Sequence, residues 1–497
     1  MSAEEEIRSE RIAKIGTLHA AGMEAYPAHT GATESIEHFL ARFEHAVADA
    51  EPVTIAGRIM AKRGQGGIMF VDIFDGSVTL ATGGNARMQA VYQKSEMDEG
   101  HFTLFGDTAD TGDFVSITGP AYITKRGEQS ILVKKWSMLA KSLLPIPTEH
   151  FGIQDPELKL RERYLDILLN SELRALFVRR ARFWKTIRTF LDEKGFLEVE
   201  TPVFESSPGG ADARPFVTHH NALDLDVYLR ISAGELWQKK LLVAGFPRVY
   251  ELGRIFRNEG QSREHLQDYM QLETYEAYAD ADSGNIFIQD LYRRIVKDVY
   301  GKYSFSINGH EVDFADEWKE LNFCTLIAEK YGVDPLNCTE AEAIKAVRDN
   351  QIQVGEELNL ARAVDHLWKS IRKGIAGPAF LVGIPVYLEP LAKRAADPRL
   401  VERVQILIAG SEVGKGFSEL NDPLDQRARF EEQQSMRDKG DDEAQRLDED
   451  YVRAMEYGMP PAFGFGVSER LFSFLENRPA HETQLFPLLR PKPTITP

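Results

Sequence analysis

The sequence predicts an α+β protein made of a small β-barrel followed by a larger domain around a mostly antiparallel sheet. Two observations favour this fold. Short runs with a period of two residues fill 51–145, and Gly, Asp or Asn ends each of them, as is typical of a small closed or partly open barrel. From residue 161 onward, longer strand-like runs and helix-rich sections follow one another without an internal repeat.

The same periodicities divide the chain into parts. Apolar residues at three-to-four spacing predict a helical extension over 1–50, and the barrel follows at 51–145. A proline-containing stretch at 146–160 is typical of a linker. Residues 161–497 then form the large domain, in which we expect a helical insertion at about 282–375.

Composition is that of an ordinary globular protein, with 43% hydrophobic and 27% charged residues. No apolar run approaches the roughly 18 residues that cross a bilayer, and the charged start is not a secretory signal. Cys324 and Cys338 form no CxxC, which excludes a zinc knuckle and a disulfide framework and predicts a reducing cytoplasmic compartment. The net charge of −18 argues against indiscriminate nucleic-acid binding, although a local basic patch is compatible with it.

Charged residues stand in the middle of two strand-like runs that we expect to form an antiparallel hairpin. In the second run Gln271, Glu273 and Tyr275 share one face, and the residues between them point to a core. The charged loop 258–268 is too long for a tight turn and predicts a flap over a ligand. Arg257 suits a phosphate or a carboxylate, because its planar fork pairs with two oxygens, and Glu273 suits an ammonium. The alternative is a solvated face with cross-strand salt bridges.

A second polar strand is predicted in the sequence GSEVGKGFSELND. The small residues Gly414 and Gly416 on one face permit close packing, while Lys415, Phe417 and Glu419 occupy the other face. The stretch is not a P-loop, since its spacing is short and Gly follows the lysine. An edge strand that uses charge against aggregation is the alternative.

A third motif lies after a charged helix predicted at 424–457. Glycines precede Arg470 at the start of an apolar helix, within 464–475. A glycine-rich turn into a helix offers backbone N–H groups to an anion. A turn that serves packing alone is the alternative.

Together with FLEVETPVF, these stretches resemble, in order, the three signature motifs of class II aminoacyl-tRNA synthetases. The stretches PGGADARPFVTHHNALDLDVYLRIS, FRNEG, GFSELNDPLDQRARFEEQ, KGDDEAQRLDEDYVRAMEYGMPP and LFPLLRPK resemble the lysyl-tRNA synthetases of the bacterial class II type. The stretch VTIAGRIMAKR resembles their anticodon-binding OB-fold barrel. The resemblance covers nearly the whole chain from about residue 50.

The resemblance implies a cytoplasmic, homodimeric ligase that uses ATP and Mg²⁺. Such enzymes activate L-lysine to lysyl-adenylate and transfer it to the 3′ end of tRNA(Lys). Because the lysine carboxylate attacks the α-phosphorus in line, catalysis is mainly positioning and charge neutralisation. Pro202 matches the motif 1 proline at the dimer interface, where we expect it to end or bend a strand.

For ATP, the resemblance assigns five residues. Arg257, which bridges the lysine carboxylate and the α-phosphate, and Arg470, which clamps the γ-phosphate, match the catalytic arginines. Glu259 is implied near the adenine amino group and His265 near the distal phosphates. Tyr269 falls where an aromatic ring stacks on adenine.

For lysine, the resemblance implies a pocket in which the substrate, and not other residues of the pocket, supplies the positive charges that pair with the carboxylates. A neutral side chain in such a pocket would leave a buried carboxylate unpaired, which supplies large discrimination. The residues that match the α-amino site are Gly210 and Glu235, and those that match the walls and end of the side-chain pocket are Glu273, Tyr275, Phe417 and Glu419.

For the metal and the anticodon, Glu412 matches a magnesium-binding carboxylate shared with ATP, and Gln405 stands where a second metal-binding glutamate is usual. Arg63 and Phe70 match positions that contact anticodon bases, with Phe70 offering a stacking face. Thr79 lies roughly where a base-reading glutamine is usual.

Three further departures mark a divergent lineage. Lys415 replaces the usual asparagine beside the lysine pocket, where it would repel an ε-ammonium unless it turns to a carboxylate or a phosphate. The flap has HLQDY instead of HNPEF. GFGVSER replaces GIGIDR, although Arg470 aligns clearly.

Three other functions compete with a lysine ligase. An aspartyl or asparaginyl ligase is disfavoured, because an acidic side chain would meet Glu273 and Glu419. A stand-alone relative that lysylates a protein would lack the barrel, which is present at 53–140. A non-enzymatic RNA-binding or regulatory module with a decayed pocket is the third.

Overall fold

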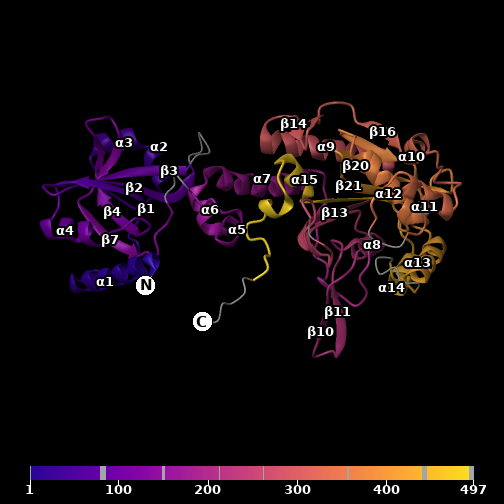
Figure 1. Cartoon of the computed structure of the whole chain (residues 1–497), viewed down its shortest axis with the longest axis horizontal. Coiled ribbons are helices and arrows are strands. Elements are labelled where there is room, and N and C mark those ends of the chain that lie inside the picture. The colour runs from indigo at the N-terminus through magenta and orange to yellow at the C-terminus, as the bar shows by residue number, and fades with distance from the viewer. Residues whose placement is uncertain are drawn as a thin grey trace. The chain divides into compact units, whose positions relative to one another are not determined.

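The computed structural model describes residues 2–78, 85–147, 152–211, 213–260, 262–354, 358–438 and 445–491. The chain divides into two compact units, coloured from indigo to yellow along the chain in Figure 1. The first unit comprises Met1–Ala175 and Leu489–Pro497, and the second comprises Leu176–Leu488. Among the described helices, none is long and apolar enough to span a bilayer.

The first unit begins with helices, as the spacing of its apolar residues predicts. Ser2 and Glu5 form a capping box at the start of the first helix, satisfying N–H groups that have no intrahelical partner. The three helices are α1 (Ala3–Ala20), α2 (Ile36–Ala41) and α3 (Phe43–Asp49).

A seven-stranded sheet with the order β5-β6-β3-β2-β1-β4-β7 forms the barrel. Its core contains Phe105, which stacks on Tyr92 with ring centroids 3.9 Å apart and meets Trp136 edge-on. The strands are β1 (Val53–Gln65), β2 (Ile68–Val78), β3 (Asn85–Gln93), β4 (Phe114–Gly119), β5 (Ala121–Ile123), β6 (Gln129–Leu132) and β7 (Lys135–Ala140), and α4 (Glu99–Thr108) joins β3 to β4.

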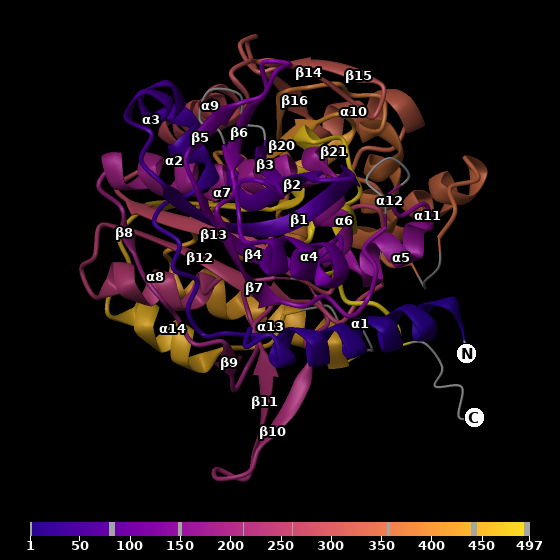
Figure 2. The ribbon, with the colours of Figure 1, turned by 90° about the vertical axis from the view of Figure 1, so that its left-hand side faces the viewer.

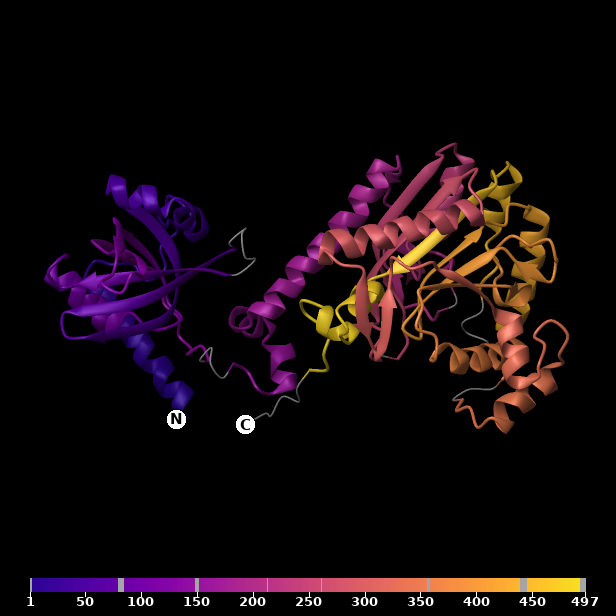
Figure 3. The same cartoon turned by 90° about the horizontal axis from the view of Figure 1, so that it is seen from above.

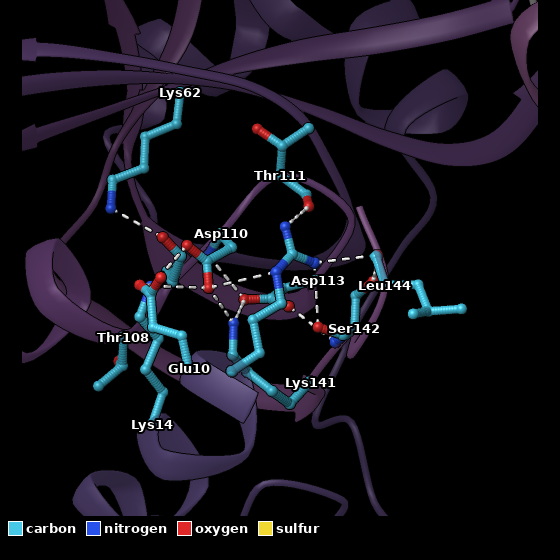
Figure 4. A network of polar contacts seen from close by, with 12 residues as sticks. Glu10, Lys14, Lys62, Thr108, Asp110, Thr111, Asp113, Lys141, Ser142 and Leu144 are labelled. Atoms are coloured by element: carbon cyan, nitrogen blue, oxygen red, sulfur yellow. Dashed lines mark hydrogen bonds and ion pairs between the residues drawn. The ribbon is translucent and has the colours of Figure 1, made fainter. Parts of the chain in front are cut away.

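A buried polar network holds α1 against the barrel (Figure 4). The Arg11 guanidinium donates to the carbonyls of Ser142 and Leu144, both at 3.0 Å, and Lys14 pairs with Asp110 at 2.8 Å. The Lys141 ammonium, also within this network, is fully buried. Since Ser142 and Leu144 follow β7 and Asp110 follows α4, α1 contacts two separate parts of the barrel sequence and is an integral part of the first unit.

Three helices follow the barrel: α5 (Pro156–Arg161), α6 (Arg163–Leu169) and α7 (Ser171–Glu193). The linker expected at 146–160 includes 148–151, which lie outside the described residues, and its last residues start α5. Asp155 caps that helix, and Pro156 occupies its first turn, where a proline has no N–H to lose.

The second unit is built on an eight-stranded sheet with the order β16-β17-β20-β21-β22-β13-β12-β8. All pairs are antiparallel except β8 with β12 and β16 with β17, which confirms the mostly antiparallel prediction. The strands are β8 (Leu197–Glu198), β12 (Arg248–Phe256), β13 (Asp268–Ala277), β16 (Lys319–Asn322), β17 (Ala379–Val382), β20 (Arg403–Ile408), β21 (Ser411–Ser418) and β22 (Ala462–Ser468).

Helix α9 (Ala281–Tyr300) crosses one face of this sheet and packs on β20, β21 and β22 (Figure 3). Its buried side chains join those of α7 and the sheet in the largest core. Helix α8 (Glu235–Val243) packs against β12 and β13. The predicted hairpin is β12 with β13, and Leu272 enters the core as expected.

A small separate sheet projects from this unit (Figures 1 and 2). It consists of β9 (Phe204–Glu205), β10 (Val217–His220) and β11 (Leu225–Leu229) in the order β10-β11-β9. Pro202 lies between β8 and β9, so the strand does end before the proline.

The helical insertion also contains strands that the sequence analysis missed. After α9 come the hairpin of β14 (Ser304–Ile307) and β15 (His310–Asp313), then β16 and helices α10 (Phe323–Tyr331), α11 (Glu340–Asp349) and α12 (Leu360–Arg372). The hairpin turns at Asn308 and Gly309, which both have positive φ. An Asn-Gly pair between two short apolar runs is the local signal that predicts such a turn.

Two C-terminal predictions need correction. The single helix expected over 424–457 is divided into α13 (Pro423–Asp438) and α14 (Glu449–Glu456), and 439–444 lie outside the described residues. The glycine-rich turn before Arg470 is instead the central strand β22, because Phe463, Phe465 and Val467 alternate into the core. The remaining elements are β18 (Ile384–Pro385), η1 (Val386–Leu388), β19 (Leu400–Val401), α15 (Arg470–Leu475) and η2 (Ala480–Thr483).

Candidate active site

A cavity of about 340 Å³ lies in the second unit, over the strands β13, β21 and β22. Most of the residues predicted for the lysine and ATP sites line it. They are Gly210, Glu235, Arg257, His265, Tyr269, Glu273, Tyr275, Gln405, Glu412, Phe417, Glu419 and Arg470. Glu259 does not line this cavity: it lies in the flap with its side chain exposed.

Glycines make room for the cavity. At Gly464 on β22 a Cβ atom would overlap the Glu419 carboxylate and the Tyr275 ring. At Gly210, where φ is +85°, a Cβ atom would lie 2.6 Å from Ser232 Oγ. The glycines of β22 therefore shape the pocket wall, which is a different role from the anion-binding turn that the sequence suggested.

Two arginines form the positive end of the cavity. The Arg257 side chain begins directly after β12, donates to the Ile231 carbonyl at 3.4 Å and lies over the Tyr269 ring. Its buried Nε has no hydrogen-bond partner among the described residues. Arg470 donates to the Glu412 carbonyl at 2.9 Å. A buried guanidinium with an unused donor fits an anionic ligand.

The flap places an unpredicted carboxylate beside these arginines. Glu264 lines the cavity, and its Oε2 accepts a hydrogen bond from Ser411 Oγ at 2.6 Å and lies 4.0 Å from Arg470 Nη1. His265 Nε2 contacts Arg470, while its Nδ1 lies 2.7 Å from Ser262 Oγ. Burial and the Arg470 charge lower the pKa of His265 to about 4. The imidazole is therefore neutral at physiological pH.

The opposite end of the cavity is negative. Glu273 is buried, and its carboxylate accepts hydrogen bonds from the Ala233 N–H at 3.0 Å, from Gln271 at 2.6 Å and from the Tyr275 hydroxyl at 3.0 Å. Burial, reinforced by the charge of Glu235, raises the pKa of Glu273. A cation that enters this end therefore stabilises the ionised form of the Glu273 carboxylate.

Lys239 corrects the expectation that substrate alone completes these charges. Its fully buried Nζ lies 2.7 Å from Glu235 Oε1 and 2.6 Å from Glu419 Oε2. The ammonium also faces the rings of Phe417 and Tyr275. Glu235 and Lys239 are four residues apart on α8, a spacing that signals such a pair in sequence.

Lys415 does not face the lysine pocket as a free cation. Its Nζ pairs with the buried Glu389 at 3.1 Å, and Arg403 lies 3.4 Å from the same carboxylate oxygen. The Gln405 amide donates to the Gly414 carbonyl at 3.0 Å, and its oxygen accepts a hydrogen bond from Arg403. That oxygen is therefore engaged with a cationic side chain rather than left for a metal ion.

Glu412 offers one carboxylate to a cation. Its Oε1 accepts from the Trp368 indole N–H at 2.7 Å. Although burial opposes ionisation, Arg372 and the Trp368 hydrogen bond lower the pKa of Glu412, so its charge is retained. The described residues contain no group of three or more metal-ligating side chains. The single carboxylate of Glu412 fits a magnesium ion that takes its other ligands from phosphates and water.

In the first unit, the two anticodon candidates are direct neighbours. Arg63 on β1 pairs across the strands with Phe70 on β2. The Arg63 side chain is 66% exposed and lies 3.6 Å from Asp72. A cation therefore lies beside an aromatic ring on this face of the barrel, a combination typical of sites that bind single-stranded nucleic acid. Thr79 lies outside the described residues.

Comparison with known proteins matches both units. Residues 155–490 match the model of the class II tRNA synthetases (D, K and N), and residues 53–139 match that of the OB-fold nucleic acid binding domain. The lysine–tRNA ligase of Roseiflexus sp. (strain RS-1) is 42% identical over 493 residues, covering 98% of this chain and 99% of its own. That of Thermotoga maritima is 37% identical over 494 residues, covering 98% and 96%.

Proposed function

The chain belongs to the class II tRNA synthetases (D, K and N), and from that membership we propose that it is a lysine–tRNA ligase that charges tRNA(Lys). Relatives of that name match it over almost their full length, which confirms the function predicted from the sequence. One observation carries the substrate assignment. A single cavity holds buried carboxylates at one end and arginines at the other, which is the charge pattern of a diamino acid beside a nucleotide.

The negative end receives the amino acid. The α-ammonium lies at Gly210 and Glu235, and the side chain runs between Tyr275 and Phe417 to the ε-ammonium site at Glu419. Oε1 of Glu419 is buried and has no hydrogen-bond partner in the described part of the chain, so the ε-ammonium supplies a missing donor. An aspartate side chain would meet three carboxylates here, which disfavours the aspartate ligase.

The positive end receives ATP. Tyr269 supplies a ring for adenine, Arg257 pairs with the α-phosphate and the lysine carboxylate, and Arg470 with the γ-phosphate. His265 stays neutral and donates or accepts a hydrogen bond near the distal phosphates. Glu412 would hold Mg²⁺ together with ATP, where the ion neutralises phosphate charge.

The reaction needs no protein base for its first step. The ionised lysine carboxylate attacks the α-phosphorus, the bond to pyrophosphate breaks, and lysyl-adenylate forms. The terminal ribose hydroxyl of tRNA then attacks the carbonyl carbon and AMP leaves. The contribution of this chain is to hold the two reactants in line, with Arg257 touching both reacting groups.

The first unit selects the tRNA. Phe70 stacks on an anticodon base and Arg63 pairs with a base or a phosphate. A local cationic site thus binds RNA although the net charge of the protein is negative.

A homodimer is supported by apolar surface on the small projecting sheet. Its exposed side chains are Phe204, Val217, Leu223 and Leu225, with exposed fractions from 43% to 67%. Phe204 pairs with Leu229 across the strands and so shares a face with Leu225, while Val217 pairs with Tyr228 on the other face. Exposed apolar side chains that share a face favour an interaction surface. Sedimentation of the protein and of the variant Phe204→Ser/Leu225→Ser tests the assignment, and an unchanged mass of one chain in both would contradict it.

ATP–pyrophosphate exchange with each of the twenty amino acids tests the ligase assignment. We expect exchange with lysine alone. Exchange with aspartate or asparagine would place the chain with the other ligases of its family, and no exchange with any amino acid would identify a non-enzymatic module.

A further inference from the structure

Lys239 is a fully buried cation that the adenylation chemistry does not use. It projects from α8 behind the amino-acid end of the cavity, and its ammonium bridges Glu235 and Glu419. It does not line the cavity, so it does not contact the substrate directly. Burial of an ammonium away from water is unfavourable, so Lys239 must make a compensating contribution.

Counting charges identifies this contribution. Three carboxylates, those of Glu235, Glu273 and Glu419, line this end of the cavity. When all three are ionised, Lys239 offsets one of them, which leaves two negative charges. Lysine carries two ammonium groups, and its carboxylate goes to Arg257 at the other end. With the substrate bound, these three carboxylates therefore face three ammonium groups.

Glu389 lies near Lys239 and forms a separate cluster with two cations, Lys415 and Arg403, which leaves one positive charge there. The Lys415 side chain is 39% exposed, so solvent screens its charge from the amino-acid site. The remaining groups that face the ammonium are the hydroxyl of Tyr451 on α14 and the rings of Tyr275 and Phe417. None of these carries a charge at neutral pH.

We propose that Lys239 is a positioning residue that sets substrate specificity by reducing the charge of the amino-acid site from three to two, the number a diamino acid neutralises. The proposal rests on the assignment of this cavity to lysine. Without Lys239, Glu235 and Glu419 would repel each other in a buried site and one would take up a proton. Lysine would then have to displace that proton, while an amino acid with one ammonium would lose its disadvantage.

Burial supports this account, since it raises the pKa of Glu419 and of Glu273, and Lys239 opposes the rise at both. Removing the cation raises these pKa values further. The carboxylates then stay protonated to higher pH, so weak lysine binding should recover as the pH increases.

Direct calorimetric binding of lysine and of 2-aminohexanoate, which lacks the ε-ammonium, tests the proposal with Lys239→Met. Lys240→Met is the matched control, because Lys240 is the next residue of α8 and its ammonium instead lies over the Trp237 ring. For Lys239→Met we expect lysine affinity to fall on the order of a hundredfold at pH 7 and the preference for lysine over 2-aminohexanoate to shrink, both recovering toward pH 9. The ATP affinity of Lys239→Met, and the affinities of Lys240→Met for all three ligands, should equal those of the unchanged protein.

An equal loss of lysine affinity at every pH would reduce Lys239 to a packing role and overturn the proposal, as would no loss at all. If Lys239→Met does not fold, the unchanged protein decides by titrations in buffers of different ionisation enthalpy. Lysine should displace no more protons than 2-aminohexanoate, because Lys239 already keeps these carboxylates ionised, and a larger number for lysine would overturn the proposal. Failure of the ligase assignment is distinct, because the unchanged protein would then show no lysine-dependent exchange.

Discussion

The Glu264 carboxylate lies 4.0 Å from the Arg470 guanidinium, across the end of the cavity assigned to the ATP phosphates. Ser411 donates to the same carboxylate and fixes it there. Glu264 thus places a negative charge beside Arg470. Bound phosphates must displace it, because like charges at this distance repel each other.

Glu264→Gln should therefore lower the KM for ATP by about three- to tenfold, since the amide leaves Arg470 free without adding charge. The KM for lysine should stay the same, because Glu264 lies at the other end of the cavity. ATP–pyrophosphate exchange at low salt measures both. A higher KM for ATP would mean that Glu264 binds the nucleotide or its cation.

Glu419→Gln should reduce kcat/KM for lysine on the order of a thousandfold, because the ε-ammonium loses its buried counter-charge and Lys239 loses a partner. Glu402→Gln, which changes an exposed glutamate next to β20, is the control and should behave as the unchanged protein. Near-normal lysine activation by the Glu419 variant would show that the ε-ammonium binds elsewhere.

Gly464→Ala should abolish lysine binding while ATP binding persists. The added methyl group overlaps the Glu419 carboxylate and the Tyr275 ring at the wall of the amino-acid site, and it does not approach the arginines. Calorimetry with each ligand separately distinguishes the two effects, and melting curves report whether the variant folds. Retained lysine affinity in a folded variant would contradict the pocket geometry.

Phe70→Ala should leave exchange intact and raise the KM for tRNA by about ten- to a hundredfold, since stacking on one base is lost. Phe70 is half-buried, and Ile123→Ala, which removes an exposed apolar side chain from β5 of the same barrel, serves as the control. Equal loss of exchange and of tRNA charging would argue against the role of the barrel in anticodon binding.

His265 should make no contribution to the pH dependence of ATP binding around the ordinary pKa of histidine, because the pKa of His265 is lowered to about 4. The ring is already neutral above about pH 5, so protonation adds no charge to the site between about pH 5.5 and pH 8. Fluorescence or calorimetric titration over this range checks the expectation. A step in ATP affinity near pH 6.5 that disappears in His265→Gln would contradict the expectation.

Sequence patterns predicted the elements that carry most of the site. The alternation around Glu273 and around Phe417 placed these residues on strands that the structure contains as β13 and β21. The barrel also follows from local periodicity, whereas its two anticodon candidates come from the family resemblance. These predictions succeeded because side-chain direction along a strand is a local property of the backbone.

Other features depended on contacts between distant segments. Gly464 and Gly466 look like a turn in sequence, and only their place between β13 and β21 makes them part of a pocket wall. Glu264 is one of several flap charges until the fold brings Ser411 and Arg470 to it.

The sequence by itself therefore determined the two-part architecture, the strands that carry the site, and the arginines and carboxylates that we assign to the substrates. Only the tertiary structure decided the charge of the amino-acid site, because Lys239 and Glu419 are 180 residues apart and meet through packing of α8 against the sheet. Electrostatic balance in a buried site depends on every charge within a few ångströms, whatever its distance along the chain.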